Sequence, residues 1–169
     1  MGLLGRLRER GREKGEPSGT RLLSPVSGTL VPLSRVGDPV FSAGAMGEGF
    51  AVRPEDEVVL SPVSGIVSVA GAPNFHAVDI AGDGGVEVLV HVGVDTVEMG
   101  GQGFKVLVRA GQRIEAGQAL LTFSHDLVTR AGFDDVVVVL VPNSADLGGV
   151  RTILDGHVDA GTPVALVGA

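Results

Sequence analysis

From Leu22 onward, the chain alternates short apolar segments with turns made of Gly, Pro, Asp and Asn. Segments of this length, separated in this way, predict many short strands. The best helix candidate outside the N-terminal arm is Ser124–Ala131, with Ser124 as N-cap and Gly132 after its end. We therefore predict an all-β fold, an antiparallel sandwich or barrel of short strands with one or two short helices. The clearest strand segments are GTLVPL (28–33), EVVLS (57–61), GIVSVA (65–70), VEVLVHV (86–92) and VVVVLV (136–141).

Two echoes in the sequence indicate an internal duplication. SPVSG at 24–28 recurs letter for letter at 61–65, each time before an apolar strand. A turn containing Gly and leading into an apolar strand also recurs. Glycine suits such a turn because it adopts conformations that other residues avoid. Two interlocked copies of one β-unit resemble the duplicated hybrid motifs of lipoyl or biotinyl carriers, zinc peptidases and one class of phosphocarriers. The fold alone leaves these three functions open. The Gly turns are VGDPV (36–40), AGQRI (110–114), AGQAL (116–120) and AGTPV (160–164).

The composition excludes several kinds of chemistry. The chain has 169 residues, enough for one domain with a real core, and its 27 glycines fit a fold rich in turns. It has no cysteine, so a disulfide framework, a thiolate zinc site and a cysteine nucleophile are all excluded. The net charge of −7 and the absence of Trp and Tyr argue against a nucleic-acid surface. We expect no nucleic-acid partner.

Charge is distributed unevenly, because basic residues gather at the N-terminus. We predict a flexible basic tail over residues 1–20 and a single domain over 21–169. The start lacks the apolar core of a secretory signal, and no apolar run in the chain is long enough to span a bilayer, so a cytoplasmic protein is expected. The leucines of residues 1–14 could make a weak contact with an anionic membrane, and a solvated tail is the alternative.

The densest group of chemically useful residues follows the strand 86–92. His91 lies in an otherwise apolar strand, and Asp95 and Glu98 after it have the spacing of a capping box. The backbone N–H groups of that turn would suit an anion. Gly100 would end the turn after about one winding.

A second histidine is expected beside the first. Asp83-Gly84-Gly85 is a hairpin signal, and a turn centred near Gly84 pairs residues whose numbers sum to 167 or 168. This register places His76 opposite His91 on one sheet face, and a slip of one residue would separate them. A neutral imidazole keeps a free lone pair and can attack phosphorus without a separate base, while a neighbouring imidazole can donate an N–H to phosphoryl oxygens. A core or surface role is the alternative, and it is the one we expect for His125 and His157.

At this point the motifs resemble a family, the glucose-type enzyme IIA of the bacterial phosphoenolpyruvate-dependent sugar phosphotransferase system. The resemblance extends over nearly the whole chain. It rests on HVGVDTVEMGGQGF (91–104), both SPVSG copies, DPVF (38–41), MGEGFAV (46–52), His76-Ala77, GQRIEAGQ (111–118) and GTPV (161–164).

The resemblance implies a role for each matching residue. His91 would be phosphorylated at Nε2, and His76 would stabilise the phosphoryl group and its transfer. Asp38 and Asp95 would meet arginines of partner proteins. Residues supporting the site would be Asn74, Gly93 and Thr96, and the apolar surface receiving partners would be Val40, Phe41, Met46, Leu89 and Val97.

The same resemblance implies the partners. The phosphoryl group would come from the histidine phosphocarrier protein and leave to a cysteine of an enzyme IIB domain of a IIB/IIC sugar permease. Unphosphorylated chain would bind regulated transporters or kinases, and the chain would be a monomer. No cofactor is required. The sugar, whether glucose, N-acetylglucosamine, maltose or a β-glucoside, is not specified, and Asn74 stands where the family usually has Thr.

Three alternatives follow from the residues themselves. A zinc metallopeptidase of the related fold would use the HxxxD spacing of His91 and Asp95, but the chain has no HxH. A lipoyl or biotinyl carrier needs a lysine at a hairpin tip, and only Lys14 and Lys105 are present. His76 and His91 could also share a zinc ion with a carboxylate of a partner, because two imidazoles leave coordination positions open.

Overall fold

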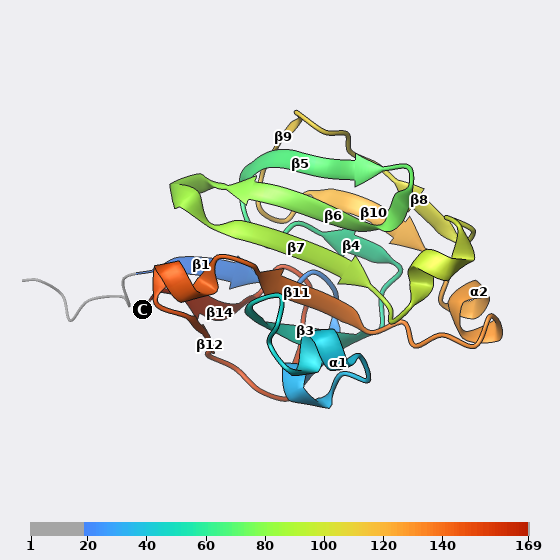
Figure 1. Ribbon diagram of the computed structural model, residues 1–169, viewed down its shortest axis with the longest axis horizontal. Coiled ribbons are helices and arrows are strands. Elements are labelled where there is room, and N and C mark those ends of the chain that lie inside the picture. Colours follow the sequence, from blue (N-terminus) through green and yellow to red (C-terminus); the bar gives the residue numbers. More distant parts are fainter. Residues whose placement is uncertain (1–18, 169) are drawn as a thin grey trace, which may run out of the picture.

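The computed structural model describes residues 19–168, which form layered antiparallel sheets (Figure 1). The large sheet has eight strands in the order β13-β2-β3-β11-β7-β6-β5-β9, and two three-stranded sheets have the orders β1-β14-β12 and β4-β10-β8. The prediction of an all-β fold is confirmed. The barrel form is wrong, because β13 and β9 remain the two open edges of the large sheet. The sandwich form is adopted: β8 and β10 lie against β6, so a small sheet covers one face of the large sheet.

The strands are short, as the sequence pattern predicts. Their bounds are β1 Thr20–Leu23, β2 Gly28–Val31, β3 Glu48–Pro54, β4 Val58–Leu60, β5 Gly65–Gly71, β6 Asn74–Gly82, β7 Glu87–Val92, β8 Phe104–Val106, β9 Arg113–Ile114, β10 Ala119–Phe123, β11 Val137–Val141, β12 Val150–Thr152, β13 His157–Val158 and β14 Pro163–Val167.

In the described part of the chain, residues 19–168, two short α-helices connect strands. Helix α2 (His125–Arg130) begins as predicted, with the Ser124 hydroxyl accepting a hydrogen bond from the Leu127 N–H at 3.1 Å. Helix α1 (Pro39–Ser42) was not specifically predicted, although Asp38 followed by proline is a typical N-terminal signal. Single 3₁₀ turns occupy η1 Leu33–Arg35, η2 Asp83–Gly85, η3 Thr96–Met99 and η4 Ser144–Leu147.

Strand β11 separates two apolar clusters, and all five of its residues are buried. Val137, Val139 and Val141 face the main core between the sheets. Val138 and Leu140 face a smaller cluster with Phe41 of α1. Both faces of β11 are therefore covered, which explains why its sequence is continuously apolar rather than alternating.

The duplicated sequence motifs form the frame of the fold by bonding to each other. The Leu23 N–H donates to the Pro62 carbonyl, and the Leu60 N–H donates back to the Pro25 carbonyl. Each motif serine also joins one Gly turn: the Gly161 N–H donates to the carbonyl of Ser24, and the Gly117 N–H donates to that of Ser61. The two kinds of sequence repeat, SPVSG and the Gly turn, are thus joined by the same contact in both halves of the domain, in agreement with the predicted duplication.

Within residues 19–168, no helix is both long enough and apolar enough to cross a membrane. The predicted basic tail and its membrane contact through residues 1–14 lie outside the described residues. The first strand of the domain begins at Thr20.

The motif serines generate a prediction about stability. Ser61 is fully buried, and its hydroxyl donates to the Val63 carbonyl at 2.6 Å. We expect Ser61→Ala to lower the free energy of unfolding by about 1–2 kcal/mol, because a buried hydrogen bond is lost. Urea denaturation measures the change. Ser68→Ala, at an exposed position on β5, is the control and should change stability little; equal effects of the two substitutions would refute the structural role.

Candidate functional site

The two histidines are brought together by the hairpin of β6 and β7. The turn forms at Asp83–Gly85, as predicted, and Gly84 has a positive φ of 78°. The register is one residue away from direct opposition, because His91 lies opposite Ala77 and Val90 opposite Val78. His76 therefore lies just before Ala77, the first residue of β6 that pairs with β7. Its ring nevertheless meets His91, with ring centroids 4.7 Å apart and planes at 81°.

Aromatic rings enclose the histidine pair. The ring of Phe41 from α1 packs edge-on against His91, with centroids 5.0 Å apart. Phe104 of β8 lies near His76, with its ring centroid 6.3 Å from that of His76. Both histidines are thereby withdrawn from water, with His76 only 7% exposed and His91 partly buried.

This burial keeps both imidazoles uncharged. Desolvation and the neighbouring His76 lower the pKa of His91 to about 4, and desolvation also lowers the pKa of His76. Asp38 and the backbone of Gly93 act in the opposite direction on the pKa of His91. Its Nδ1 atom is buried without a hydrogen-bond partner among residues 19–168. One side of the His91 ring is therefore closed to any reaction partner.

The turn after His91 has little room. Gly93 has a φ of 82°, and a Cβ there would lie 2.3 Å from the Thr96 methyl group and 2.7 Å from the Asp134 carbonyl. Thr96 is buried, and its hydroxyl donates to the Val92 carbonyl. These contacts fix where the strand ends and therefore where His91 points.

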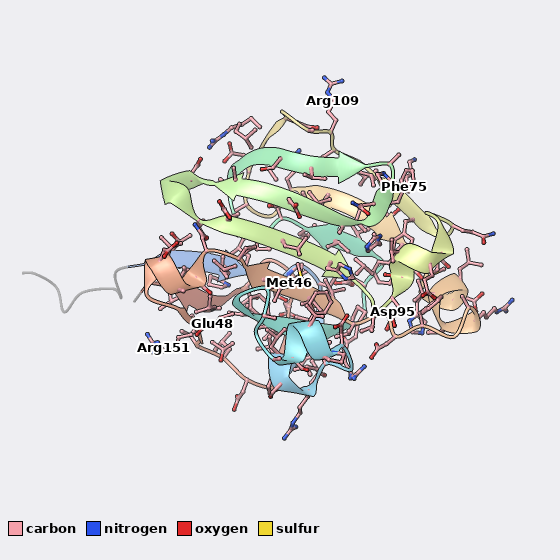
Figure 2. All side chains as sticks on the ribbon, viewed as in Figure 1. Met46, Glu48, Phe75, Asp95, Arg109 and Arg151 are labelled. Atoms are coloured by element: carbon pink, nitrogen blue, oxygen red, sulfur yellow. The ribbon has the colours of Figure 1, made fainter. Side chains whose placement is uncertain are left out.

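The predicted capping box is wrong. Asp95 is left-handed, with a φ of 59°, and its side chain makes no capping hydrogen bond to η3. The Glu98 N–H bonds instead to the backbone carbonyl of Asp95. Gly100 does end the turn, as expected, in a left-handed conformation. The carboxylate of Asp95 thus remains exposed beyond the end of β7 (Figure 2).

The residues expected to receive partners divide into two groups. Val40, Met46 and Val97 are among the most exposed large apolar residues, at 48%, 40% and 54%. Phe41 is 5% exposed and Leu89 is partly buried, so Phe41 supports the His91 ring rather than forming an open surface. Phe41 is buried because its side chain packs in the apolar cluster that includes Val138 and Leu140 of β11. Figure 2 places Met46 beside β7.

The other expected residues lie close to the histidines. Asp38 caps α1, where its carboxylate accepts the Val40 N–H at 2.8 Å, and it favours the charged form of His91. Asn74 is the first residue of β6, two positions before His76. His125 and His157 lie apart from the pair: His125 Nδ1 bonds to Asp135, and His157 Nε2 lies 2.9 Å from Glu55.

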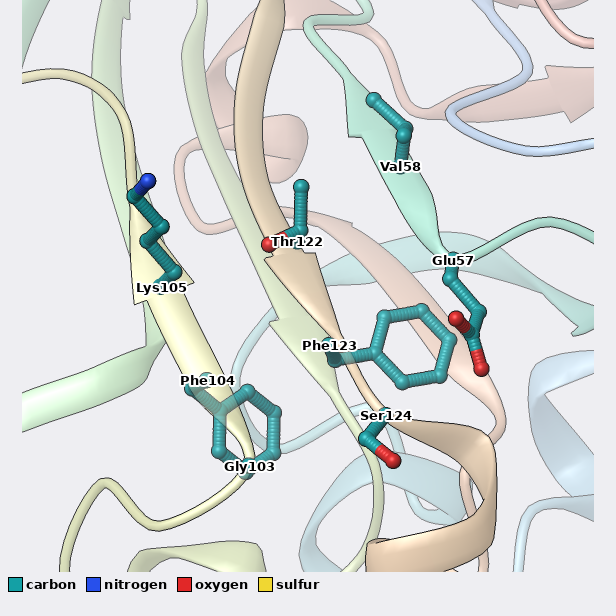
Figure 3. Close-up of a pocket in the computed structure, with 8 residues that line it drawn as sticks. All are labelled: Glu57, Val58, Gly103, Phe104, Lys105, Thr122, Phe123 and Ser124. Carbon is teal, nitrogen blue, oxygen red and sulfur yellow. The ribbon is translucent and has the colours of Figure 1, made fainter.

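Metal and ligand sites elsewhere have little support. Within residues 19–168, no three His, Cys, Asp or Glu side chains are placed to hold a metal ion, as the metallopeptidase alternative would require. An open groove over β4, β8 and β10 is lined by Glu57, Lys105 and Phe104, among others, and by neither His76 nor His91 (Figure 3).

One polar residue on the histidine face was missed by sequence reasoning. Asp79 lies opposite Leu89 and Val69, on the same face as His91. It is half-buried, and desolvation raises the pKa of its carboxyl group. The signal was present in HAVDIA (76–81), where a carboxylate alternates with buried Val78 and Ile80.

Comparison with known proteins identifies the family. The sequence model of the protein family described as phosphoenolpyruvate-dependent sugar phosphotransferase system, EIIA 1, matches residues 20–147. This chain belongs to that family. It is therefore an EIIA of the sugar phosphotransferase system by family, and the resemblance seen in the sequence is confirmed.

Individual relatives agree with this assignment. The mannose-specific EIIBCA component of Corynebacterium glutamicum is 38% identical over 146 residues, which is 86% of this chain and 21% of that protein. The glucose-specific EIIA component of Halalkalibacterium halodurans is 40% identical over 131 residues, 78% of this chain and 75% of that protein. The solved glucose permease IIA from Mycoplasma capricolum matches with a TM-score of 0.75 and 32% identity, covering 87% of this chain and 94% of that one. The chain spans only 21–22% of the length of the first curated relatives.

The lowered pKa of His91 predicts a dependence of stability on pH. The folded chain binds this proton less readily than the unfolded chain, so stability is full above the ordinary value of 6.5 and falls as the pH drops from 6.5 toward about 4. We expect His91→Gln, which cannot titrate, to lose less stability over this range, by up to about 3 kcal/mol. Urea unfolding at both ends of the range measures the difference.

The two histidines outside the pair do not obscure this comparison. Their carboxylate partners raise the pKa values of His125 and His157, so their contributions favour the folded state at low pH. Both are present in the wild type and in His91→Gln, and they cancel in the difference. The same loss of stability in both proteins would show that His91 is not buried in its neutral form.

Proposed function

We propose that this EIIA chain is a phosphocarrier that accepts a phosphoryl group on His91 from the histidine phosphocarrier protein and passes it to a cysteine of an enzyme IIB domain. The observation that supports this most directly is a pair of neutral imidazoles near the start of β6 and the end of β7, with ring centroids 4.7 Å apart. A neutral ring holds the lone pair that a nucleophile requires.

The reactive atom is Nε2 of His91. Nδ1 is buried, so Nε2 is the nitrogen left to meet a partner. The Nε2 lone pair forms the new N–P bond as the N–P bond of the incoming phosphohistidine breaks, and the donor imidazole leaves with that electron pair. The onward step reverses the roles: a thiolate of IIB attacks phosphorus, and the Nε2–P bond breaks back to neutral His91.

The surroundings of His91 favour this transfer. Bond formation at Nε2 places positive charge on the ring, and Asp38 and the Gly93 backbone, which raise its pKa, also favour that charge. His76 remains neutral and stands edge-on to His91, where an N–H donates to the phosphoryl oxygens. Gly93 and Thr96 hold the turn, and Asn74 begins the strand that carries His76. The reaction requires no cofactor.

The partners dock on the exposed surface around His91. Val40, Met46 and Val97 supply apolar area there, and Asp38 and Asp95 supply negative charge for arginines of the partners. The name EIIBCA of one relative combines EIIA with EIIB and EIIC, which supports a IIB/IIC permease as the acceptor. A zinc ion shared by His76, His91 and a carboxylate of a partner remains a subsidiary proposal.

Sugar specificity is a property of the permease in this proposal. The names of relatives with 38% and 40% identity specify mannose and glucose, respectively. The histidine site transfers only the phosphoryl group and never touches the sugar. We therefore assign no particular sugar to this chain.

Phosphoryl labelling tests the proposal. With phosphoenolpyruvate, enzyme I and the histidine phosphocarrier protein, we expect one acid-labile, base-stable label on the chain. His91→Ala should abolish the label, because it removes the nucleophile. His76→Gln should accept the label but block its transfer to a IIB domain, because it removes the neighbouring imidazole.

The control for this experiment is His125→Ala, which removes a histidine that is exposed and bonded to Asp135. This variant should accept and transfer phosphoryl groups like the wild type. Labelling of His91→Ala, or rapid onward transfer by His76→Gln, would refute the assigned roles.

A further inference from the structure

A groove of about 330 Å³ lies on the same sheet face as His91, nearer the start of β7. Its apolar walls include Met46, Leu89 and Pro142, and Asp79 and Glu87 also line it. Leu89 lies two residues before His91 on β7, so both side chains point from the same face. The groove is therefore continuous with the surface on which the proposed partners dock. Met46, which Figure 2 labels, is one of the residues that line the groove.

The groove contains negative charge with no counter-charge. Asp79 and Glu87 make no side-chain hydrogen bond or ion pair with any residue of 19–168, and no basic residue lines the groove. Ala81 pairs with Glu87 and Asp79 with Leu89, so the two carboxylates are diagonal neighbours on one face, about 7–8 Å apart at the backbone.

Asp79 is in an unfavourable environment in the free chain. It lies between Val69 and Leu89 in a row across three strands, and burial against them raises the pKa of its carboxyl group. A half-buried carboxylate without a partner costs free energy, which a cation would recover. A side chain with a long apolar stem and a positive head matches both the walls and the charge of the groove.

We propose that this groove receives a basic side chain, arginine or lysine, of the protein that docks against His91, with Asp79 as its main counter-charge and Glu87 as the second. The contact sets partner specificity: a docking protein without a basic residue at this place leaves Asp79 desolvated and unpaired. This inference rests on the proposed function, because it assumes that partners dock on the His91 face. The resemblance to the enzyme IIA family implies Asp38 and Asp95 as contacts but not this groove.

A small probe tests the groove without any partner protein. N-acetyl-arginine amide is titrated into the isotope-labelled full chain, with N-acetyl-citrulline amide, its neutral isostere, as the matched ligand. We expect saturable NMR shifts at Asp79, Glu87 and Leu89 with the arginine compound, at a dissociation constant of about millimolar order. The citrulline compound should give no saturable shifts, and Asp79→Asn should remove those of the arginine compound. No saturable shifts, or equal shifts from both compounds, would overturn the proposal.

Binding of the unphosphorylated IIB domain tests the same contact in the complex. We expect Asp79→Asn to weaken binding about tenfold and Glu87→Gln less, as for loss of a partly buried charge pair. Asp159→Asn, which removes the same charge on the turn between β13 and β14, should change binding less than about twofold. Alanine substitution of one basic residue of IIB should weaken binding to the wild-type chain, and should weaken binding to the Asp79→Asn chain much less.

The two proposals fail in different ways. Loss of the label on His91 would refute the phosphocarrier role, whereas both binding measurements use unphosphorylated chain. Normal labelling together with unchanged binding by Asp79→Asn would refute the groove alone. Thermal unfolding confirms that each variant folds, and Asp79→Ala replaces Asp79→Asn if the latter is unfolded.

Discussion

The withdrawal of the His91 ring from water is the constraint on which the site depends. A histidine on an exposed strand would spend part of its time protonated near neutral pH and would then lack a lone pair. Burial of the ring and the neighbouring His76 prevent this by lowering the pKa of His91. Phe41 and His76, which both pack against the ring, come from segments far apart in the sequence. Every other feature of the site positions this neutral ring or stabilises the charge that forms on it.

The duplicated frame explains how so short a chain holds those segments in place. The SPVSG motifs exchange backbone hydrogen bonds and each accepts one Gly turn, so the two halves of the domain are joined at their starts. Strand β11 then passes between two apolar clusters and pairs with β7, placing Val138 beside His91 and Leu140 beside Leu89. The position of His91 is thus fixed by pairing on both sides of β7, with Ala77 on the other edge.

The sequence was sufficient for features encoded locally and insufficient for those set by distant contacts. The hairpin at Asp83–Gly85 and the helix capped by Ser124 could be predicted because their signals lie within a few residues. The backbone of Asp95 could not, since the crowding of Gly93 against Thr96 and Asp134 is what shapes that turn. The burial of Phe41 likewise depends on β11, which is about a hundred residues away.

The histidine pair shows how a register that is wrong by one residue can still give the right neighbours. Strict alternation would send the side chains of His76 and Ala77 to opposite faces, so pairing of Ala77 with His91 would separate the imidazoles. This alternation does not hold His76 in place, because His76 comes before Ala77, where the pairing of β6 with β7 begins, and its backbone is not bonded to β7. Asp79 obeys the rule, and it is therefore held on the His91 face among apolar neighbours. The pairing of β6 with β7 thus leaves His76 able to turn toward His91 and also holds the desolvated carboxylate of Asp79 beside the site. Desolvation of this carboxylate costs free energy, which a cationic group of a partner is suited to recover.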